Sequence, residues 1–351
     1  MEEKRDQRPK TVKKAATSVA VIQWEKGDGI SEIIADELSA LGYTPVTFLF
    51  SSSIPEGVSF VFSFGPYGDF LRAPYELAKM PPKKRPKFIH WNTEGLPDLR
   101  IPRLFMRAIG NVRSRLDPCI RLMREHWARQ RMLRFRYVGD YYRVHAAGLL
   151  DVFADSSAIY ARWHATQGLQ TVHAPWGGTR RWYRRLQLER DIDVLWMGGL
   201  NSRRRNRLLT KLCPELTRRG MSVYLADGLN NPFIFGDERI EFLNRSKITL
   251  NLTRTWYDDN FSRFAIAAPN SSLVISEPML PHSPRVIPGV HYAEAPIEQL
   301  ADQIEHYLAH EDERQEIAEN AFALFTEELS FSKSIADIMA AAEQTRAGGE
   351  R

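Results

Sequence analysis

The sequence predicts an α/β protein built from two doubly wound domains that face a cleft. The chain has 351 residues, which exceeds the usual size of one domain. Apolar, strand-like runs alternate with helix-like stretches twice along it, and the segment 174–178, Ala-Pro-Trp-Gly-Gly, separates the two series. Proline fixes one backbone torsion there and the glycines free others, so the chain can turn sharply between the domains.

The first series has continuously apolar strand candidates, as buried parallel strands do. After the first of them, apolar residues recur at helical spacing between Ile30 and Leu41, and Gly42 ends this helix. We expect strands at residues 18–24, 46–50, 58–64, 88–91, 151–154 and 170–173. These define an N-terminal domain at 17–174, preceded by a densely charged tail at 1–16 that lacks the apolar core of a secretory signal.

An arginine-rich and predicted helical insertion at about 97–150 interrupts this alternation. Such a concentration of arginine attracts phosphate, nucleic acid or anionic lipid. Because no recognised nucleic-acid-reading module accompanies it, we expect no specific nucleic acid partner. An amphipathic basic helix equally suits an anionic acceptor or a peripheral membrane contact through residues 100–143, while the plain alternative is a solvated arginine face over a packed apolar stripe.

The second series follows a predicted linker at 175–190. We expect strands at 192–197, 222–226, 247–252 and 273–276, and helices from there to the end. This gives a C-terminal domain at 191–342 and a short tail at 343–351. The two cysteines, Cys119 and Cys213, lie far apart, and no apolar run is long enough to span a bilayer. A cytoplasmic protein, soluble or attached to a membrane surface, fits this pattern.

The most informative turn follows the strand that ends at residue 197. Gly198 and Gly199 allow close approach of a ligand to the backbone, and Asn201 or Ser202 can cap the next helix. Arginines crowd the start of that helix at positions 203, 204, 205 and 207. Cations oppose the helix dipole there by about 0.3–1 kcal/mol each, so a bound diphosphate would explain them. The alternative is a solvated basic helix start.

A second constellation is Asp-Asp-Asn-Phe-Ser-Arg at 258–263. Ser262 is a candidate helix cap, and Arg263 can form a bidentate contact with phosphate oxygens. A surface ion pair between Arg263 and the two aspartates, Asp258 and Asp259, is the alternative. Asp227, after the strand at 222–226, either holds a base or ribose or forms an ordinary turn with Gly228, and the turn is favoured.

In the first half, a carboxylate at the end of the strand at 88–91 can deprotonate an acceptor hydroxyl, which makes Glu94 the preferred general base. Asp28 is the second candidate and Asp69 a third, although both fit ordinary turns. His90 lies within an apolar strand and is expected to be structural.

Several absences narrow the chemistry. The turn at 27–29 lacks the third glycine of the dinucleotide fingerprint, and the sequence has no phosphate-binding Walker loop, zinc-ligand pair or nucleophile elbow. The Asp-Ile-Asp at 191–193 opens a strand rather than ending one, so it is not interpreted as a metal motif. Neither a metal nor a cofactor is implied.

The C-terminal half resembles the glycosyltransferase-like domain of the spore-maturation protein family. The resemblance lies in Asp-Ile-Asp-Val-Leu-Trp-Met-Gly-Gly at 191–199, Arg-Ser-Lys-Ile-Thr-Leu-Asn-Leu at 245–252, Ser-Arg-Phe at 262–264, Leu-Val-Ile-Ser-Glu-Pro at 273–278 and Pro-Gly-Val-His-Tyr at 288–292. Gln-Leu-Ala-Asp at 299–302 and pairs within the terminal helices continue it, in consistent order over residues 191–342.

The resemblance implies a GT-B fold, in which the C-terminal domain holds a nucleotide-sugar donor. It places the donor diphosphate near Gly199, Arg204 and Arg263. The predicted donor-binding residues are therefore Gly198, Gly199, Arg203, Arg204, Asp227, Asn251, Asp259, Ser262 and Arg263. Many relatives carry a glutamate and, further on, a glycine where this chain has Ile266 and Ser271. In GT-B enzymes that glutamate commonly contacts the donor ribose or sugar.

Two functions are compatible with these residues. The first is metal-independent transfer of a sugar from a nucleotide-diphosphate donor to a hydroxyl of an unknown glycan, protein or lipid acceptor, with arginines stabilising the leaving diphosphate. The second is a non-catalytic GT-B-like scaffold that binds a nucleotide or glycan during assembly or maturation. The missing glutamate favours the scaffold slightly, and acceptor-dependent turnover would discriminate between the two.

Overall fold

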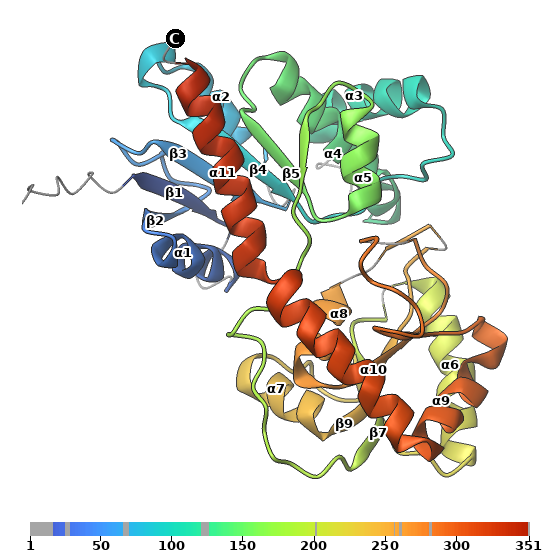
Figure 1. The fold of residues 1–351 in the computed structure, drawn as a ribbon. Helices are drawn as coiled ribbons and strands as arrows, with labels where there is room; N and C mark the ends of the chain where they lie inside the picture. The colour runs from blue at the N-terminus through green and yellow to red at the C-terminus, as the bar shows by residue number, and fades with distance from the viewer. Residues whose placement is uncertain are drawn as a thin grey trace, which may run out of the picture.

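The structure, a computed structural model, describes residues 17–24, 29–65, 70–120, 126–200, 202–255, 257–259, 262–280 and 283–349. For 117–120, 126–132 and 346–349 only the backbone is described. The predicted tail at 1–16 and the candidates Asp28 and Asp69 lie outside these ranges. Two parallel sheets, each in its own domain, make up the molecule (Figure 1).

Six parallel strands form the first sheet, in the order β2-β1-β3-β4-β5-β6. They are β1 Ser18–Gln23, β2 Thr44–Leu49, β3 Phe60–Phe64, β4 Lys87–Asn92, β5 Val152–Asp155 and β6 Thr171–His173. All six were predicted to within a few residues. The helices between them are α1 Ile30–Ala40, α2 Arg72–Ala78, the 3-10 turn η1 Pro82–Lys84, α3 Arg103–Ile120, α4 His126–Ala146 and α5 Ala158–Ala165.

Both faces of this sheet are covered, as a doubly wound fold requires. One core cluster joins α1 to the strands through Ile33, Ile34 and Leu38. The other joins α2, α3, α4 and α5 to the opposite face. The predicted insertion at 97–150 is therefore the α3–α4 hairpin, and α4 packs directly on the sheet through Val138 and Tyr141.

Five parallel strands form the second sheet, in the order β11-β10-β9-β7-β8. They are β7 Ile192–Met197, β8 Val223–Ala226, β9 Ser246–Asn251, β10 Leu273–Ser276 and β11 Ala293–Glu294. The sequence predicted the first four. Its helices are α6 Arg203–Arg218, α7 Gly236–Arg245, α8 Ser262–Ala267, α9 Leu300–Ala309 and α10 Glu311–Ala323, with short turns η2 Ala268–Asn270, η3 Ile297–Gln299 and η4 Leu324–Glu328.

The last helix, α11 Phe331–Gly349, belongs to the first domain (Figure 1). Its buried residues Phe331, Ile335 and Ile338 join the core cluster of α1 and the first sheet. The prediction that residues up to 342 belong to the C-terminal domain and that a tail begins at 343 is therefore corrected. Helical spacing reveals an apolar face but not which of two sheets it covers.

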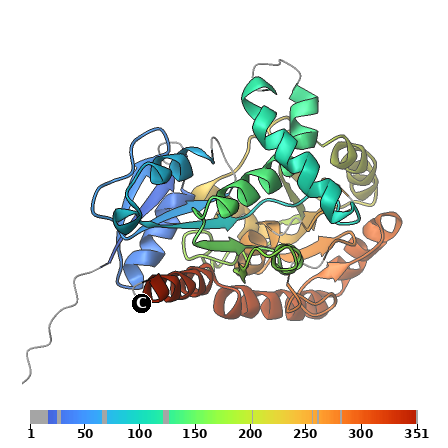
Figure 2. The same cartoon turned by 90° about the horizontal axis from the view of Figure 1, so that it is seen from above.

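The chain crosses between the domains twice, and the two crossings pack against each other. The predicted turn at 174–178 meets the segment before α11, where Phe331 N donates to Gly178 O at 3.0 Å. A Cβ on Gly177 would lie 1.5 Å from Leu329 O, so only glycine fits. The rings of Trp176 and Trp182 stack here at 5.7 Å. Seen from above, α10 and α11 run in succession along one side of both domains (Figure 2).

Candidate functional site

The carboxyl end of β7 brings a glycine and a buried arginine into contact. Gly198 has a φ of 143°, in the region that favours glycine, and a Cβ there would lie 2.5 Å from Nη2 of Arg263. Arg263 enters from α8. Its Nε donates to Met197 O at 2.8 Å, its Nη1 donates to Asn251 Oδ1 at 3.1 Å, and its guanidinium lies 4.2 Å from the ring centre of Trp196.

Among the described residues, no carboxylate contacts the guanidinium of Arg263. The residue is only 7% exposed, and both of its hydrogen bonds go to neutral oxygens. Burial, together with the positive charges of Arg205 and Arg254, lowers its pKa well below the ordinary value, and the negative charge of Asp258 offsets only part of this. The predicted alternative, an ion pair with Asp258 or Asp259, is not formed among the described residues. A buried cation that no carboxylate contacts directly is costly, so this position favours an anionic ligand.

The start of α6 lies beside the same strand. Ser202 caps the helix, as predicted, by accepting a hydrogen bond from Arg205 N at 3.4 Å. Arg203 is the first helical residue and is exposed, and Gly199 is half-buried in the turn before it. The unpaired backbone N–H groups of this first turn add positive potential to that of the arginines.

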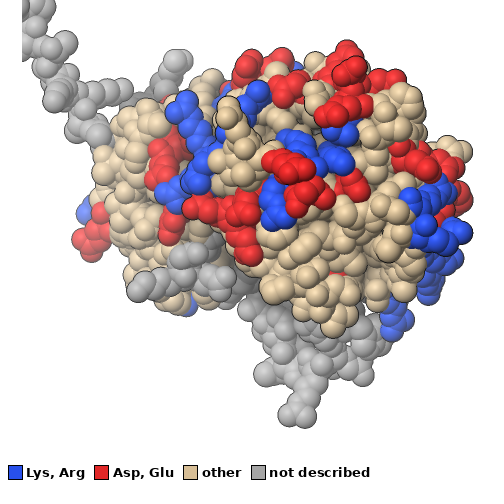
Figure 3. Space-filling view, turned by 90° about the horizontal axis from the view of Figure 1, so that it is seen from below, with Lys and Arg blue, Asp and Glu red and all other residues tan. Residues whose placement is uncertain are grey.

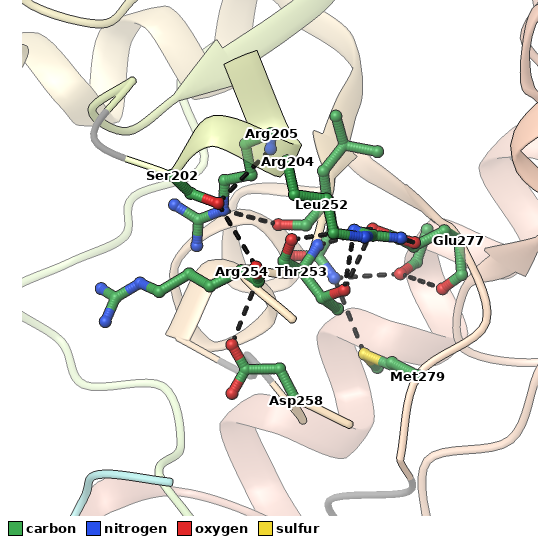
Figure 4. A network of polar contacts seen from close by, with 11 residues as sticks. Ser202, Arg204, Arg205, Leu252, Thr253, Arg254, Asp258, Glu277 and Met279 are labelled. Carbon is green, nitrogen blue, oxygen red and sulfur yellow. Dashed lines mark hydrogen bonds and ion pairs between the residues drawn. The ribbon is translucent and has the colours of Figure 1, made fainter. Parts of the chain in front are cut away.

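Arg204 was predicted to contact the diphosphate, but in the structure its guanidinium forms an ion pair with Glu277 (Figure 4). Its Nη1 donates to Glu277 Oε1 at 2.7 Å, and its Nη2 pairs with Glu277 Oε2. The same Nη1 donates to Thr253 O at 3.0 Å, and Thr253 N donates to Glu277 Oε1 at 2.7 Å. Arg204 therefore ties α6 to the ends of β9 and β10. Sequence spacing gave no signal for this pair because its members are 73 residues apart.

Arg254, which the sequence analysis did not single out, is a second exposed cation beside Arg203. Its backbone is fixed, since its N–H donates to Asp258 Oδ2 at 3.3 Å and its carbonyl accepts from Ser202 Oγ at 3.3 Å. Its side chain extends away from the network and makes none of the drawn contacts (Figure 4). Its charge lowers the pKa values of both Arg263 and Glu94. The guanidinium therefore lies within electrostatic reach of both domains.

Glu94 faces this cluster from the N-terminal domain. It follows β4 and is half-buried. Burial raises its pKa, Arg254 and Arg134 oppose the rise, and Asp258 and Asp259 add to it. Asn92 holds the backbone on both sides of the carboxylate, because its Nδ2 donates to Glu94 O at 3.0 Å and its Oδ1 accepts from Glu94 N at 3.2 Å.

Asn92 is itself fixed by buried polar groups. Its Nδ2 also donates to Asp155 Oδ2 at 2.7 Å, and its Oδ1 accepts from the hydroxyl of Tyr141 at 2.8 Å. Desolvation raises the pKa of Asp155 well above its ordinary value. His90 is fully buried and burial lowers its pKa to about 3, which confirms the structural role predicted for it. These hydrogen bonds of Asn92 hold the backbone of Glu94 in a fixed position.

An ion pair joins the two domains at this point. Nη2 of Arg134 in α4 donates to Asp258 Oδ1 at 2.9 Å, and both side chains are largely buried. The Arg134 guanidinium also lies 5.9 Å from the ring centre of Tyr257. Asp259, predicted to bind the donor, instead raises the pKa values of Glu94, Asp155 and Tyr160 in the opposite domain. Its negative charge therefore acts on titratable groups of the N-terminal domain.

The remaining predicted donor-binding residues have the following surroundings. Asp227 accepts from Leu229 N at 2.8 Å and Asn230 N at 2.7 Å, so it stabilises its own turn. Asn251 is buried, and its amide orients Arg263. Ser262 is exposed as the first residue of α8.

The acidic pair before and within β7 is also structural. Asp191 pairs with Arg245 at 2.7 Å and Asp193 with Lys247 at 2.7 Å, in agreement with the interpretation that 191–193 is not a metal motif. No cluster of three or more His, Cys, Asp or Glu side chains suited to a metal occurs in the described part of the chain.

Comparison with known proteins supports the interpretation of the C-terminal half. Residues 203–340 match the family described as glycosyl transferase-like, within the range over which the sequence resemblance extends. None of the curated proteins matches the chain in sequence.

Solved structures match over nearly the whole chain. Sucrose-phosphate synthase from Thermosynechococcus elongatus has a TM-score of 0.58 at 11% identity, with 95% of this chain and 100% of that chain covered. HepE from Anabaena, in complex with UDP and glucose, has a TM-score of 0.57 at 9% identity, with 93% and 100% covered. AviGT4, a glycosyltransferase of avilamycin A biosynthesis, has a TM-score of 0.52 at 15% identity, with 94% and 97% covered. The chain has the GT-B fold, as predicted.

Proposed function

We propose that this GT-B chain is a glycosyltransferase that moves a sugar from a nucleoside diphosphate donor to an acceptor hydroxyl without a metal ion. The glycosyl transferase-like family match over 203–340 supports sugar transfer. Structures similar in fold were solved with UDP and glucose in HepE, and with GDP in an α1,3-fucosyltransferase of TM-score 0.51. Nucleoside diphosphates are therefore the donor class to test first.

The observation that carries the proposal is the buried charge of Arg263. In the proposed complex the donor diphosphate lies against Gly198, Gly199 and the start of α6, where Nη2 of Arg263 meets it. Nη2 makes no hydrogen bond within the described residues, while Nε and Nη1 hold the side chain in place. A cation already fixed by its neighbours loses little entropy on binding, which suits electrostatic stabilisation of a leaving group.

Arg254 is proposed as the second contact to the phosphates, and Arg203 as a third from the helix start. Arg204 is proposed to fix the segment around Thr253 through its ion pair with Glu277, and not to contact the ligand. During transfer the bond between the anomeric carbon and the diphosphate oxygen breaks, and negative charge grows on that oxygen. Arg254 and Arg263 then stabilise this charge.

Glu94 is the proposed general base. The acceptor hydroxyl oxygen forms a bond to the anomeric carbon, and its proton passes to the Glu94 carboxylate. The raised pKa of Glu94 makes the carboxylate a better proton acceptor than an exposed glutamate. The positive charges of Arg254 and Arg134 oppose this rise and favour the ionised form. The second candidate base, Asp28, lies outside the described residues.

Ile266 occupies the position where many similar proteins carry a glutamate. It is half-buried and packs against the core clusters of both domains, so it offers the donor no polar group. Ser271 adopts a φ of 55°, the left-handed conformation expected where those proteins have glycine. The agreement at Ser271 supports the alignment, and the proposed donor contacts therefore omit this glutamate.

A thermal-shift screen with UDP, GDP, dTDP, CDP and ADP, and NAD as control, tests the donor site. Stabilisation by one nucleoside diphosphate is expected, and it should be lost in Arg263→Met. The corresponding nucleotide sugar is then assayed for sugar transfer or slow donor hydrolysis. Absence of stabilisation by all five would refute the donor site. Binding without transfer to any acceptor, and without hydrolysis, would instead support a non-catalytic scaffold.

A further inference from the structure

The α3–α4 hairpin places polar groups inside and apolar groups outside. Arg113 and Ser114 of α3 are 4% and 2% exposed. On the same helix Leu104 and Phe105 are 82% and 65% exposed. Burial of arginine and exposure of large apolar side chains are both unusual in a water-facing helix. The outer face of α3 is therefore suited to contact an apolar surface.

Ser114, Asp140 and Arg143 on the inner side are paired with one another, so the inversion is not a local packing error. Ser114 Oγ donates to Asp140 Oδ1 and accepts from Nη1 of Arg143 at 2.8 Å. Nε of Arg136 lies 3.5 Å from Asp140 Oδ2. The two helices also touch backbone to backbone, since a Cβ on Gly139 would lie 1.9 Å from Gly110 O. The outer face consequently stands on a rigid pair of helices.

Eight exposed residues of α3 form two parallel rows with a spacing of four. One row is apolar and consists of Leu104, Ala108, Val112 and Leu116. The adjacent row is basic and polar and consists of Arg103, Arg107, Asn111 and Arg115. Residues four apart form one ridge on a helix, so an apolar ridge about 18 Å long lies beside a basic ridge of equal length.

A groove of about 740 Å³ opens beside these ridges, between α2, α3 and α4. Its floor is mostly apolar and includes Leu71, Pro74 and Leu149. Arginines line it at 107, 115 and 143. The combination of an apolar floor and cationic lining suits an amphiphile whose polar end is negatively charged.

We propose that the outer face of α3, defined by Arg103, Leu104, Phe105, Arg107, Val112, Arg115 and Leu116, docks onto an anionic lipid bilayer. The apolar ridge and Phe105 enter the boundary between headgroups and acyl chains, and the basic ridge contacts lipid phosphates. Residues 103–116 contain no Asp or Glu. By contrast, acidic and basic side chains are interspersed over much of the face in Figure 3.

The helix would lie in the membrane surface and not cross it. No helix in the described ranges combines the length and apolar character needed to span a bilayer. The docking face is independent of the proposed sugar transfer, because none of its residues belongs to the Arg263–Glu94 site. Failure of one proposal therefore leaves the other standing.

Co-sedimentation of the full chain with vesicles tests the proposal. Vesicles of phosphatidylcholine alone are compared with vesicles containing 30% phosphatidylglycerol, at two salt concentrations. Binding is expected only to the anionic vesicles and should weaken as salt rises. The variant Leu104→Glu should bind about tenfold more weakly or worse, because it loses an apolar contact and adds a negative charge. Since Leu104 is 82% exposed, the variant should fold normally.

The matched control is Leu229→Glu, because Leu229 is 80% exposed in the other domain. This variant should bind anionic vesicles as the wild type does. A wild type that ignores anionic vesicles, or binds neutral ones equally, would overturn the proposal. So would equal losses in the two variants. A dimer in light scattering that Leu104→Glu dissociates, without vesicle binding by the wild type, would make this face a contact between two copies instead.

Discussion

Replacement of Arg263 by methionine tests whether its buried charge serves a ligand. Methionine keeps an unbranched apolar stem over Trp196 but removes the guanidinium. The free protein loses two hydrogen bonds to neutral oxygens, and it also loses a desolvated charge. These effects oppose each other, so the free energy of unfolding of the nucleotide-free protein should change by less than about 2 kcal/mol.

The effect on nucleotide binding should be larger and of one sign. A charge-assisted hydrogen bond contributes about 1.5–3 kcal/mol, so its loss raises the Kd about 10–150-fold. At a nucleotide concentration of about 100 times the wild-type Kd, the wild type gains about 2.7 kcal/mol of stability. The variant at the same concentration keeps only about 0.3–1.4 kcal/mol.

Isothermal titration calorimetry with the nucleotide identified by the screen gives both Kd values. Arg218→Met is the matched control, because Arg218 is an exposed arginine at the opposite end of α6. The control should bind with the wild-type Kd. An Arg263→Met protein that is folded and binds with unchanged Kd would refute the reasoning, and an equal loss in Arg218→Met would show only a general effect of charge.

Five further outcomes are expected. Glu94→Gln should lower kcat by about 100-fold or more while the donor Kd is unchanged, measured by transfer kinetics and calorimetry, and an unchanged kcat would remove Glu94 from its role. Because a base must be ionised, activity should fall as pH drops through the raised pKa of Glu94. Arg134→Met removes a charge that lowers this pKa, so the acidic limb of the pH–rate profile should move to higher pH, and a move to lower pH would contradict the assignment. Gly198→Ala should weaken nucleotide binding in calorimetry, since its Cβ would displace the Arg263 guanidinium. Ser271→Gly should stabilise the fold by up to about 1 kcal/mol in chemical denaturation by relieving a left-handed backbone, and destabilisation would contradict this.

Local pattern was sufficient for most of the fold. Of the eleven strands in the described residues, ten were predicted, because most of them are short apolar runs between turn residues. The exception, β11 Ala293–Glu294, is two residues long and has no pattern to detect. The return of α11 to the first domain was missed for another reason: the sequence shows that Phe331, Ile335 and Ile338 share a face, but the sheet that this face covers depends on the whole topology.

Site residues could be predicted only where the local sequence around them forms a recognisable motif. Gly198 and Arg263 were identified because each belongs to a recognisable turn or helix start. The partners that decide their neighbours' roles are distant in sequence. Glu277 forms an ion pair with Arg204, 73 residues away in the sequence, and Arg134 forms one with Asp258, 124 residues away. Arg254 lies in a loop without a motif, so its exposure beside Arg263 became visible only in three dimensions.

The ion pair between Arg134 and Asp258 explains how a diphosphate can be held beside two aspartates. The Asp258 carboxylate lies close to Arg254, since its Oδ2 accepts a hydrogen bond from Arg254 N at 3.3 Å. Without a cationic partner, its negative charge would repel phosphates proposed to lie against Arg254. Arg134 contacts the other oxygen at 2.9 Å and so offsets that negative charge. The compensating cation comes from α4, in the domain that carries Glu94. Separation of the domains would therefore leave Asp258 uncompensated, so the donor should bind most tightly when the base is already in place.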